Sequence, residues 1–224
     1  MGKQKPLQQQ AYDYLLDQIT SGVLRPGVVY SETRIAAGIG ISRTPVRDAL
    51  VRLSQDRMID ILPSRGFRLH QLTEEDVYTT FQARTAVEGY CALELAAGRG
   101  SAKGAQTLAA LRESIEQLEQ QIAGGQPMPV MLDSDLAFHK ALVGYVGNRE
   151  LNRLYETLNH RVASIALESF TLPGRPAQAL MEHRAILRAL CTAADRFETY
   201  RAVTRHMEAS RDIVLGLLGR QESK

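Results

Sequence analysis

The first third of the chain contains three segments in which apolar residues recur every three or four positions, the spacing of amphipathic helices. They run from Leu7 to Ser21, from Ser31 to Gly38 and from Ser42 onward. A short connection, Ile39 to Ile41, joins the second segment to the third. The pattern therefore predicts a helix-turn-helix unit with the first helix packed against it.

Two short runs rich in β-prone residues come next, Met58 to Leu62 and Phe67 to His70. The four residues between them, Pro63 to Gly66, are typical of a turn. We therefore expect a β-hairpin that forms a wing beside the helix-turn-helix, with Arg65 and Gly66 at its tip.

The third helix separates apolar from polar side chains. Ser42 is a suitable N-cap residue, and Pro45 falls in the first turn, where its missing N–H breaks no helical hydrogen bond. One face is apolar: Val46, Ala49, Leu50 and Leu53. Thr44 and Arg47 lie on the other face, and Arg43 lies at the helix start, where free N–H groups can also bind phosphate. This arrangement predicts a DNA-recognition helix.

The charge distribution agrees with a division into two parts. Ten lysines and arginines stand against six acidic residues through Leu72, a net charge of +4, whereas the rest of the chain has 17 against 19, a net charge of −2. An excess of this size does not by itself identify a nucleic-acid-binding protein. Taken alone, Arg43, Arg47 and Arg52 are equally well explained as the solvated face of an ordinary helix.

From Thr73 onward the pattern predicts six helices and no strand. Capping residues and glycines delimit them: Thr73 to about Ala97, Ser101 to before Gly124, a segment between Pro129 and Gly147, Asn148 to about Phe170, a segment from the Thr171–Pro176 loop to about Thr192, and Asp195 to near Gly219. The expected fold class is mainly α, with a winged helix-turn-helix domain at residues 1–72 and an all-α antiparallel six-helix bundle at residues 73–224.

Composition excludes several classes of protein. No stretch reaches the roughly 18 to 20 apolar residues that a membrane span needs, and the N-terminus is polar rather than signal-like. We therefore expect a cytoplasmic protein with no membrane partner. Two cysteines, Cys91 and Cys191, lie within apolar helical patterns, which favours buried thiols over a disulfide, metal or redox role.

Four residues of the predicted bundle form a candidate metal site. Asp135 and His139 are four residues apart on one helix and so project from the same face, as two ligands of one ion would. His183 and His206 fall on the last two helices, and facing helices of a bundle can converge on one ion. Three imidazoles and one carboxylate suit a divalent transition metal: zinc, nickel, manganese or iron. The alternative is that each histidine is an ordinary hydrogen-bonded polar residue.

The N-terminal part resembles the winged helix-turn-helix of the GntR family of bacterial transcription regulators. The resemblance rests on Leu24 to Gly27, Ser31-Glu32, the run from Ser42 to Leu53, and Leu62 to Gly66. At positions 35–41 the chain has Ile-Ala-Ala-Gly-Ile-Gly-Ile where the family usually has Leu-Ala-Glu-X-Leu-Gly-Val. The added glycine loosens the short helix but removes no base-reading position.

This resemblance implies roles for individual residues. Arg34, Arg43 and Arg47 are expected to contact bases or phosphates, Thr44 a phosphate, and Gly66 is expected to let the wing backbone enter the minor groove. Three further residues complete the candidate DNA-binding set: Ser42, Arg52 and Arg65.

The second half resembles the FCD effector domain found in the FadR subfamily of GntR regulators. The resemblance rests on the run from Asp135 to His139, Gly147-Asn148 with Leu151, the run from Glu182 to Ile186, Asp195, and His206. Many members of that subfamily bind a metal through one aspartate and three histidines, and all four positions are filled here. Six helices rather than seven imply the VanR-like branch.

A small organic acid is the expected effector. A metal held by four protein groups in octahedral geometry keeps two open positions, which a carboxylate or hydroxy acid could occupy. Arg84 resembles a position where family members place an arginine toward the ligand, and it could pair with a carboxylate. The alternative for Arg84 is a salt bridge to Glu88, four residues further on. Asn159 is a second candidate effector-binding residue.

The function predicted from these features is that of a DNA-binding transcriptional regulator, not an enzyme. A homodimer would place two recognition helices on a pseudo-palindromic double-stranded operator and, acting as a repressor, would be released by the effector. A metal-dependent hydrolase is one alternative that the same ligands allow, although no general base is assigned nearby. In a third interpretation the metal is purely structural and the bundle only dimerises the chain.

Overall fold

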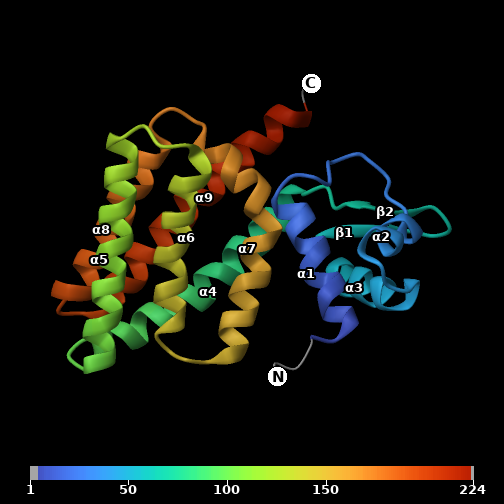
Figure 1. Ribbon diagram of the computed structural model, residues 1–224. Helices are drawn as coiled ribbons and strands as arrows, with labels where there is room; N and C mark the ends of the chain where they lie inside the picture. The colour runs from blue at the N-terminus through green and yellow to red at the C-terminus, as the bar shows by residue number, and fades with distance from the viewer. Residues whose placement is uncertain (1–4, 223–224) are drawn as a thin grey trace. The chain divides into compact units, whose positions relative to one another are not determined.

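The computed structural model describes residues 5–222, and the side chains of all of these except 163–165 and 221–222. The chain forms two compact units, Met1–Leu72 and Thr73–Lys224 (Figure 1). None of the described helices is long and apolar enough to cross a membrane.

From residue 5 onward, the first unit has three helices followed by a β-hairpin: α1 (Leu7–Thr20), α2 (Glu32–Ile39), α3 (Arg43–Gln55), β1 (Ile59–Leu62) and β2 (Gly66–Leu69). The two strands pair in antiparallel register, with Ile59 opposite Leu69 and Leu62 opposite Gly66. The predicted helix-turn-helix and wing are confirmed.

One predicted boundary in this unit is wrong, because α2 does not end at Gly38. Gly38 and Ile39 continue the helix, and Gly40 closes it in the left-handed conformation, with φ of 69°. The Ile41 N–H then donates to the Ala36 carbonyl at 3.1 Å. A left-handed glycine followed by this hydrogen bond is a common helix ending, and of the two glycines only Gly40 takes that conformation.

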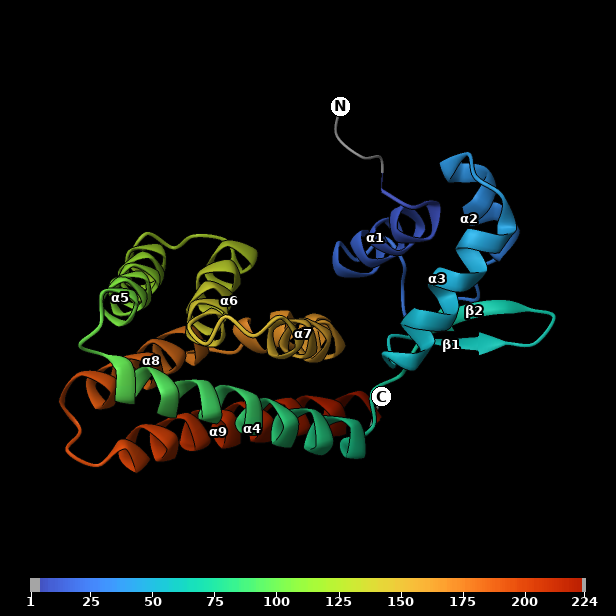
Figure 2. The same cartoon turned by 90° about the horizontal axis from the view of Figure 1, so that it is seen from below.

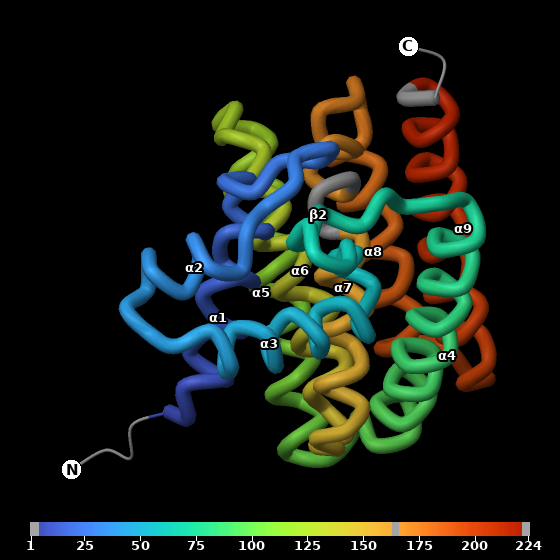
Figure 3. The backbone as a smooth tube through the Cα atoms, turned by 90° about the vertical axis from the view of Figure 1, so that its right-hand side faces the viewer, coloured from blue at the N-terminus to red at the C-terminus, as the bar shows by residue number. Residues whose placement is uncertain are grey.

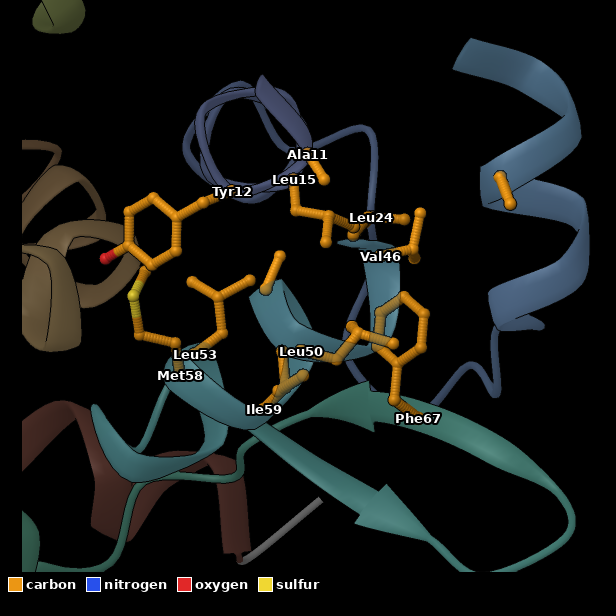
Figure 4. Close-up of a cluster of buried hydrophobic side chains, with 12 residues drawn as sticks. Ala11, Tyr12, Leu15, Leu24, Val46, Leu50, Leu53, Met58, Ile59 and Phe67 are labelled. Atoms are coloured by element: carbon orange, nitrogen blue, oxygen red, sulfur yellow. The ribbon is translucent and has the colours of Figure 1, made fainter. Parts of the chain in front are cut away.

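Apolar side chains of the three helices and the hairpin form the core of the first unit (Figure 4). The four residues predicted for the apolar face of α3 are all buried: Val46, Ala49, Leu50 and Leu53. Phe67 of β2 is fully buried beneath them, and its backbone forms a β-bridge with Tyr30. Burial of this face of α3 leaves the opposite face exposed.

The described part of the second unit, residues 73–222, contains six helices, as predicted: α4 (Glu74–Gly98), α5 (Ala102–Ala123), α6 (Met128–Gly144), α7 (Arg149–Phe170), α8 (Arg175–Thr192) and α9 (Arg196–Glu222). The long helices α4 and α9 run side by side (Figures 2 and 3). Helix α5 packs against α6 and α8, and α8 packs against α9.

Local capping explains where several of these helices begin. Thr73 and Asp76 form a reciprocal capping box at the start of α4. The backbone nitrogen of Asp76 lies 3.1 Å from Oγ1 of Thr73, and the backbone nitrogen of Thr73 lies 3.0 Å from Oδ2 of Asp76. Ser101 and Asn148 accept hydrogen bonds from backbone N–H groups at the starts of α5 and α7. These are the starts that the cap residues predicted.

Two predicted boundaries of the second unit differ from the structure. Helix α8 already begins at Arg175, within the segment predicted as loop, because Gly174 adopts the left-handed conformation before it and Pro176 fits the first turn. Helix α9 continues past Gly219 to Glu222. A single glycine in a helix costs only about 1 kcal/mol relative to alanine and does not have to end it.

Candidate functional site

Three histidine side chains from three helices meet in the interior of the second unit. His139 lies on α6, His183 on α8 and His206 on α9, and their exposed fractions are 1%, 1% and 3%. The Nε2 atom of His139 lies 3.2 Å from Nε2 of His183 and 3.2 Å from Nε2 of His206. Ligand atoms of all three residues lie within 4.8 Å of one another.

Asp135 joins this cluster from one helical turn before His139. Its Oδ1 atom lies 3.4 Å from Nε2 of His183, and its Oδ2 atom lies 4.0 Å from Nε2 of His139. Oδ1 is buried and accepts no hydrogen bond from any described residue. The structure thus brings together the four residues that were predicted from the sequence as metal ligands.

Two glutamates, not identified from the sequence, hold the outer nitrogens of the histidines. Nδ1 of His139 lies 2.5 Å from Oε2 of Glu88, and Nδ1 of His206 lies 2.7 Å from Oε2 of Glu182. An ionised carboxylate only accepts hydrogen bonds, so Nδ1 carries the proton and, in a neutral imidazole, Nε2 keeps its lone pair. Both lone pairs then point into the cluster.

Each of these glutamates is held in turn by a buried arginine. Nε of Arg84 donates to Oε1 of Glu88 at 2.9 Å, so the salt bridge considered as the alternative for Arg84 is formed. Nη1 of Arg175 donates to Oε2 of Glu182 at 3.0 Å, and its Nη2 donates to Ser210 at 2.9 Å. Two arginine–glutamate–histidine chains therefore converge on the cluster.

The electrostatics favour the ionised forms of Glu88 and Glu182 and the neutral forms of His183 and His206. Burial alone would raise the pKa of Glu88, but Arg84 and His139 outweigh it and lower that pKa to about 2. Burial lowers the pKa of His183 well below its ordinary value, and the neighbouring His206 and His139 lower it further. Burial also lowers the pKa of His206, even though Glu182 opposes the shift. Neutral imidazoles are the form that binds metal.

The donor set fits a divalent transition-metal ion. The Nε2 atoms of His139 and His206 lie 3.2 Å apart, and the lone pair of each points toward the other. These lone pairs repel each other unless a cation lies between the two nitrogens. The unpartnered Oδ1 of Asp135 adds a negative charge at the same place. Three imidazole nitrogens with one carboxylate suit zinc, nickel, manganese or iron.

Two polar side chains of α7 are buried without hydrogen-bond partners among the described residues. They are the hydroxyl of Tyr155, which is 3% exposed, and Oδ1 of Asn159, the second effector candidate. The Tyr155 ring centroid lies 6.0 Å from Cζ of Arg84. Burial raises the pKa of Tyr155, and Glu88 raises it further, although Arg84 and the neighbouring Asn159 side chain oppose the shift, so the hydroxyl stays protonated and can donate a hydrogen bond.

A groove of about 560 Å³ lies between α3 and the wing of the first unit. Four of the candidate DNA-binding residues line it: Arg43, Arg47, Arg65 and Gly66. Glu32 of α2 also lines the groove and binds Arg43 and Arg47 of α3. Nη2 of Arg47 lies 2.7 Å from Oε1 of Glu32, and Arg43 donates to the same oxygen. These hydrogen bonds, led by that from Arg47, lower the pKa of Glu32.

Three other candidates, Arg34, Ser42 and Thr44, are exposed but lie outside this groove. Ser42 occupies the N-cap position of α3 as expected, but its side chain makes no capping hydrogen bond.

Arg52 has a different environment from the other arginines of α3. Its Cζ atom lies 3.8 Å from the centroid of the Tyr12 ring, and its Nη1 donates to Gln9 of α1 at 3.0 Å. The side chain is half-buried against α1, so the structure gives it a packing role there.

Gly66 is needed for the fold of the wing itself. Its φ of +118° disfavours other residues, and a Cβ atom at this position would lie 2.0 Å from the Tyr30 carbonyl oxygen. The Tyr30–Phe67 bridge therefore accounts for the glycine without reference to DNA, and entry of the wing into a minor groove stays a prediction.

The fold and these two sites define a winged helix-turn-helix protein in which the wing is followed along the chain by an all-helical domain. Residues 7–69 match the family model described as bacterial regulatory proteins of the gntR family, and residues 79–209 match that of the FCD domain. The chain belongs to the GntR family and contains an FCD domain; it is a transcriptional regulator of this type.

Similar proteins agree with that assignment. The "Probable D-xylose utilization operon transcriptional repressor" of Paenarthrobacter nicotinovorans is 31% identical over 202 residues, which are 89% of this chain and 85% of the relative. The HTH-type transcriptional regulator YdhC of Bacillus subtilis (strain 168) is 29% identical over 186 residues, 83% of this chain and 81% of the relative. A crystal structure of a GntR-type regulator from Rhodococcus sp. RHA1 has a TM-score of 0.73 at 22% identity and covers 93% of this chain and 97% of that one. These relatives are transcriptional regulators, not enzymes.

Proposed function

We propose that this regulator is a repressor of the VanR-like branch, whose FCD domain binds a divalent transition metal and, at that metal, a small carboxylate effector. One observation supports the metal above all others. The inward Nε2 atoms of His139 and His206 lie 3.2 Å apart while their Nδ1 atoms are held by Glu88 and Glu182. Asp135 and His183 complete the set of four ligands. The bound metal would supply a positive charge and open coordination positions for the acid.

The DNA-binding part of the proposal rests on the groove between α3 and the wing. Arg43 and Arg47 are mostly exposed there, with side-chain exposed fractions of 57% and 63%. Arg34, Thr44 and Arg65 lie exposed nearby in the same unit and are proposed to contact phosphates or bases. A homodimer would carry two such faces, matching the two half-sites of an operator.

A covalent connection supports coupling between the two sites. Strand β2 of the wing ends at Leu69, and α4 begins at Glu74, fixed by the Thr73 capping box. Helix α4 carries Glu88, which contacts His139 of the cluster, and Arg84, which donates to Glu88. An effector that changes the position of α4 therefore acts on the helix that follows the wing along the chain. Such an effector releases the protein from DNA if it binds the DNA-free protein more tightly than the DNA-bound protein.

The experiment begins with DNA selected from a random library by the purified, zinc-loaded regulator. Fluorescence anisotropy then measures the affinity for this DNA in the presence of a panel of carboxylic acids. The proposal predicts that at least one acid weakens DNA binding and that EDTA treatment abolishes this response. DNA binding that no acid changes, in a protein that does contain metal, would favour a purely structural metal instead.

A further inference from the structure

The metal-site region contains buried polar atoms that make no hydrogen bond of good geometry with the described residues. They are the Tyr155 hydroxyl, Oδ1 of Asn159 and Oδ1 of Asp135. The Asn159 side chain lies beside the Tyr155 hydroxyl and acts to lower its pKa. Burying such a group without a partner costs about 1 to 3 kcal/mol. Native proteins retain few of them, and a missing ligand is one reason for the exceptions.

Tyr155 is the member of this set that can donate a hydrogen bond to an anion. Its ring packs with Val87, Cys91 and Val143, which holds it in place. The guanidinium of Arg84 lies near the same ring, and Glu88 already occupies its Nε donor. A tyrosine and a cation are thus held together next to Glu88, which contacts the proposed metal ligand His139.

The charged side chains around the cluster, which are buried or mostly buried, limit the charge of the ligand. The carboxylates of Glu88, Asp135 and Glu182 contribute three negative charges, and the guanidinium groups of Arg84 and Arg175 contribute two positive charges. A divalent ion brings the sum to plus one when the histidines are neutral. A buried uncompensated charge is costly, so a ligand with one negative charge completes the balance.

We infer that the effector site takes a monocarboxylate and that the Tyr155 hydroxyl donates a hydrogen bond to its carboxylate. This inference rests on the metal and effector proposed above, and it narrows the effector from small organic acids in general to acids with one carboxylate. A dicarboxylate of the same length would leave the site with a net negative charge, and it is predicted to bind more weakly.

The test uses the full-length, zinc-loaded protein and isothermal titration calorimetry. Matched acids are compared: butyrate with succinate, and lactate with tartronate. The variant Tyr155→Phe removes only the hydroxyl, and Tyr90→Phe, at a side chain 46% exposed on α4, is the matched control. Zinc content and Tm are measured for each variant without acid.

We expect the monocarboxylate of at least one pair to bind more tightly than its partner. Tyr155→Phe should weaken that binding roughly 10- to 100-fold, the usual effect of losing a hydrogen bond to a charged group, while Tyr90→Phe should not. Zinc content should be unchanged in Tyr155→Phe, and its Tm without acid should be equal or higher, because an unpartnered hydroxyl has been removed.

A preference for dicarboxylates, or equal acid affinity in Tyr155→Phe and the unmodified protein, would overturn this inference alone. A lower Tm of Tyr155→Phe without acid would assign the hydroxyl a structural role and would also overturn it. A zinc-loaded protein that binds none of the acids would overturn both the inference and the effector part of the proposed function.

Discussion

Glu88 and His139 are joined by a hydrogen bond of 2.5 Å between Oε2 and Nδ1 in a fully buried environment. The other oxygen of Glu88 accepts from Arg84. One carboxylate therefore orients a proposed metal ligand and neutralises a buried guanidinium.

The substitution Glu88→Gln tests this double role. The amide cannot neutralise Arg84, so we expect the free energy of unfolding to fall by about 3 to 5 kcal/mol. We also expect metal affinity to fall about 10- to 100-fold, because His139 loses the partner that orients its ring. Chemical denaturation and competition with a zinc indicator measure the two effects. The control is Glu94→Gln, an exposed position on α4, and equal behaviour of the two variants would refute the role assigned to Glu88.

Arg47 and Arg52 lie on the same helix and should respond differently to substitution by alanine. Arg47 is exposed in the groove, so Arg47→Ala should weaken DNA binding by about 1 to 3 kcal/mol if it reads a base and should leave Tm nearly unchanged. Arg52 packs on Tyr12, so Arg52→Ala should lower stability by about 1 kcal/mol and affect DNA binding less. Anisotropy titrations and thermal melts of both variants check this, and the reverse pattern would contradict the assignment.

Gly66 and Gly38 provide a matched pair of glycine substitutions. Gly66→Ala places a methyl group against the Tyr30 carbonyl at a positive φ, so we expect a loss of about 1 to 3 kcal/mol or more. Gly38 lies inside α2, and apart from its chain neighbours and the backbone of the helix itself, no described atom lies within 4 Å of the position that a Cβ would occupy there. Gly38→Ala should therefore stabilise the first unit by about 0.5 to 1 kcal/mol. Thermal unfolding of both variants measures the difference. A Gly66→Ala variant with the same stability as the unmodified protein would show that the β-bridge between Tyr30 and Phe67 does not require a glycine at position 66.

The elements of the fold were predictable because their signals are local. The apolar face of α3 follows from residues three and four apart, and the capping box of Thr73 and Asp76 spans one turn. The ends of α2 and α9 were harder to predict, since a glycine can either end a helix or continue it. Gly40 ends α2 while Gly38 and Gly219 do not, and this depends on the backbone conformation that the surroundings impose.

The candidate metal site was predictable only in part. Asp135 and His139 share one helix, so their proximity follows from helical geometry. The arrival of His183 and His206 at the same point depends on how three helices pack, and no local pattern encodes it. Glu182 directly precedes His183, a position that gives no indication of its contact with His206 on another helix.

The environment of Arg52 was not predictable from the helical pattern. At 100° per residue, Arg47 and Arg52 lie at equal angles from the centre of the buried face of α3, on opposite flanks. Only the packing of α1 on one of these flanks places Arg52 against Tyr12 and Gln9.

The metal content of the purified protein, measured by inductively coupled plasma mass spectrometry, tests the central claim most directly. We predict about one divalent transition-metal ion per chain after supplementation and dialysis, and much less in His183→Ala. His160→Ala, a histidine of α7 outside the cluster, should keep the metal. A native protein that retains no metal, or a His183→Ala variant that retains as much as the native protein, would contradict the account.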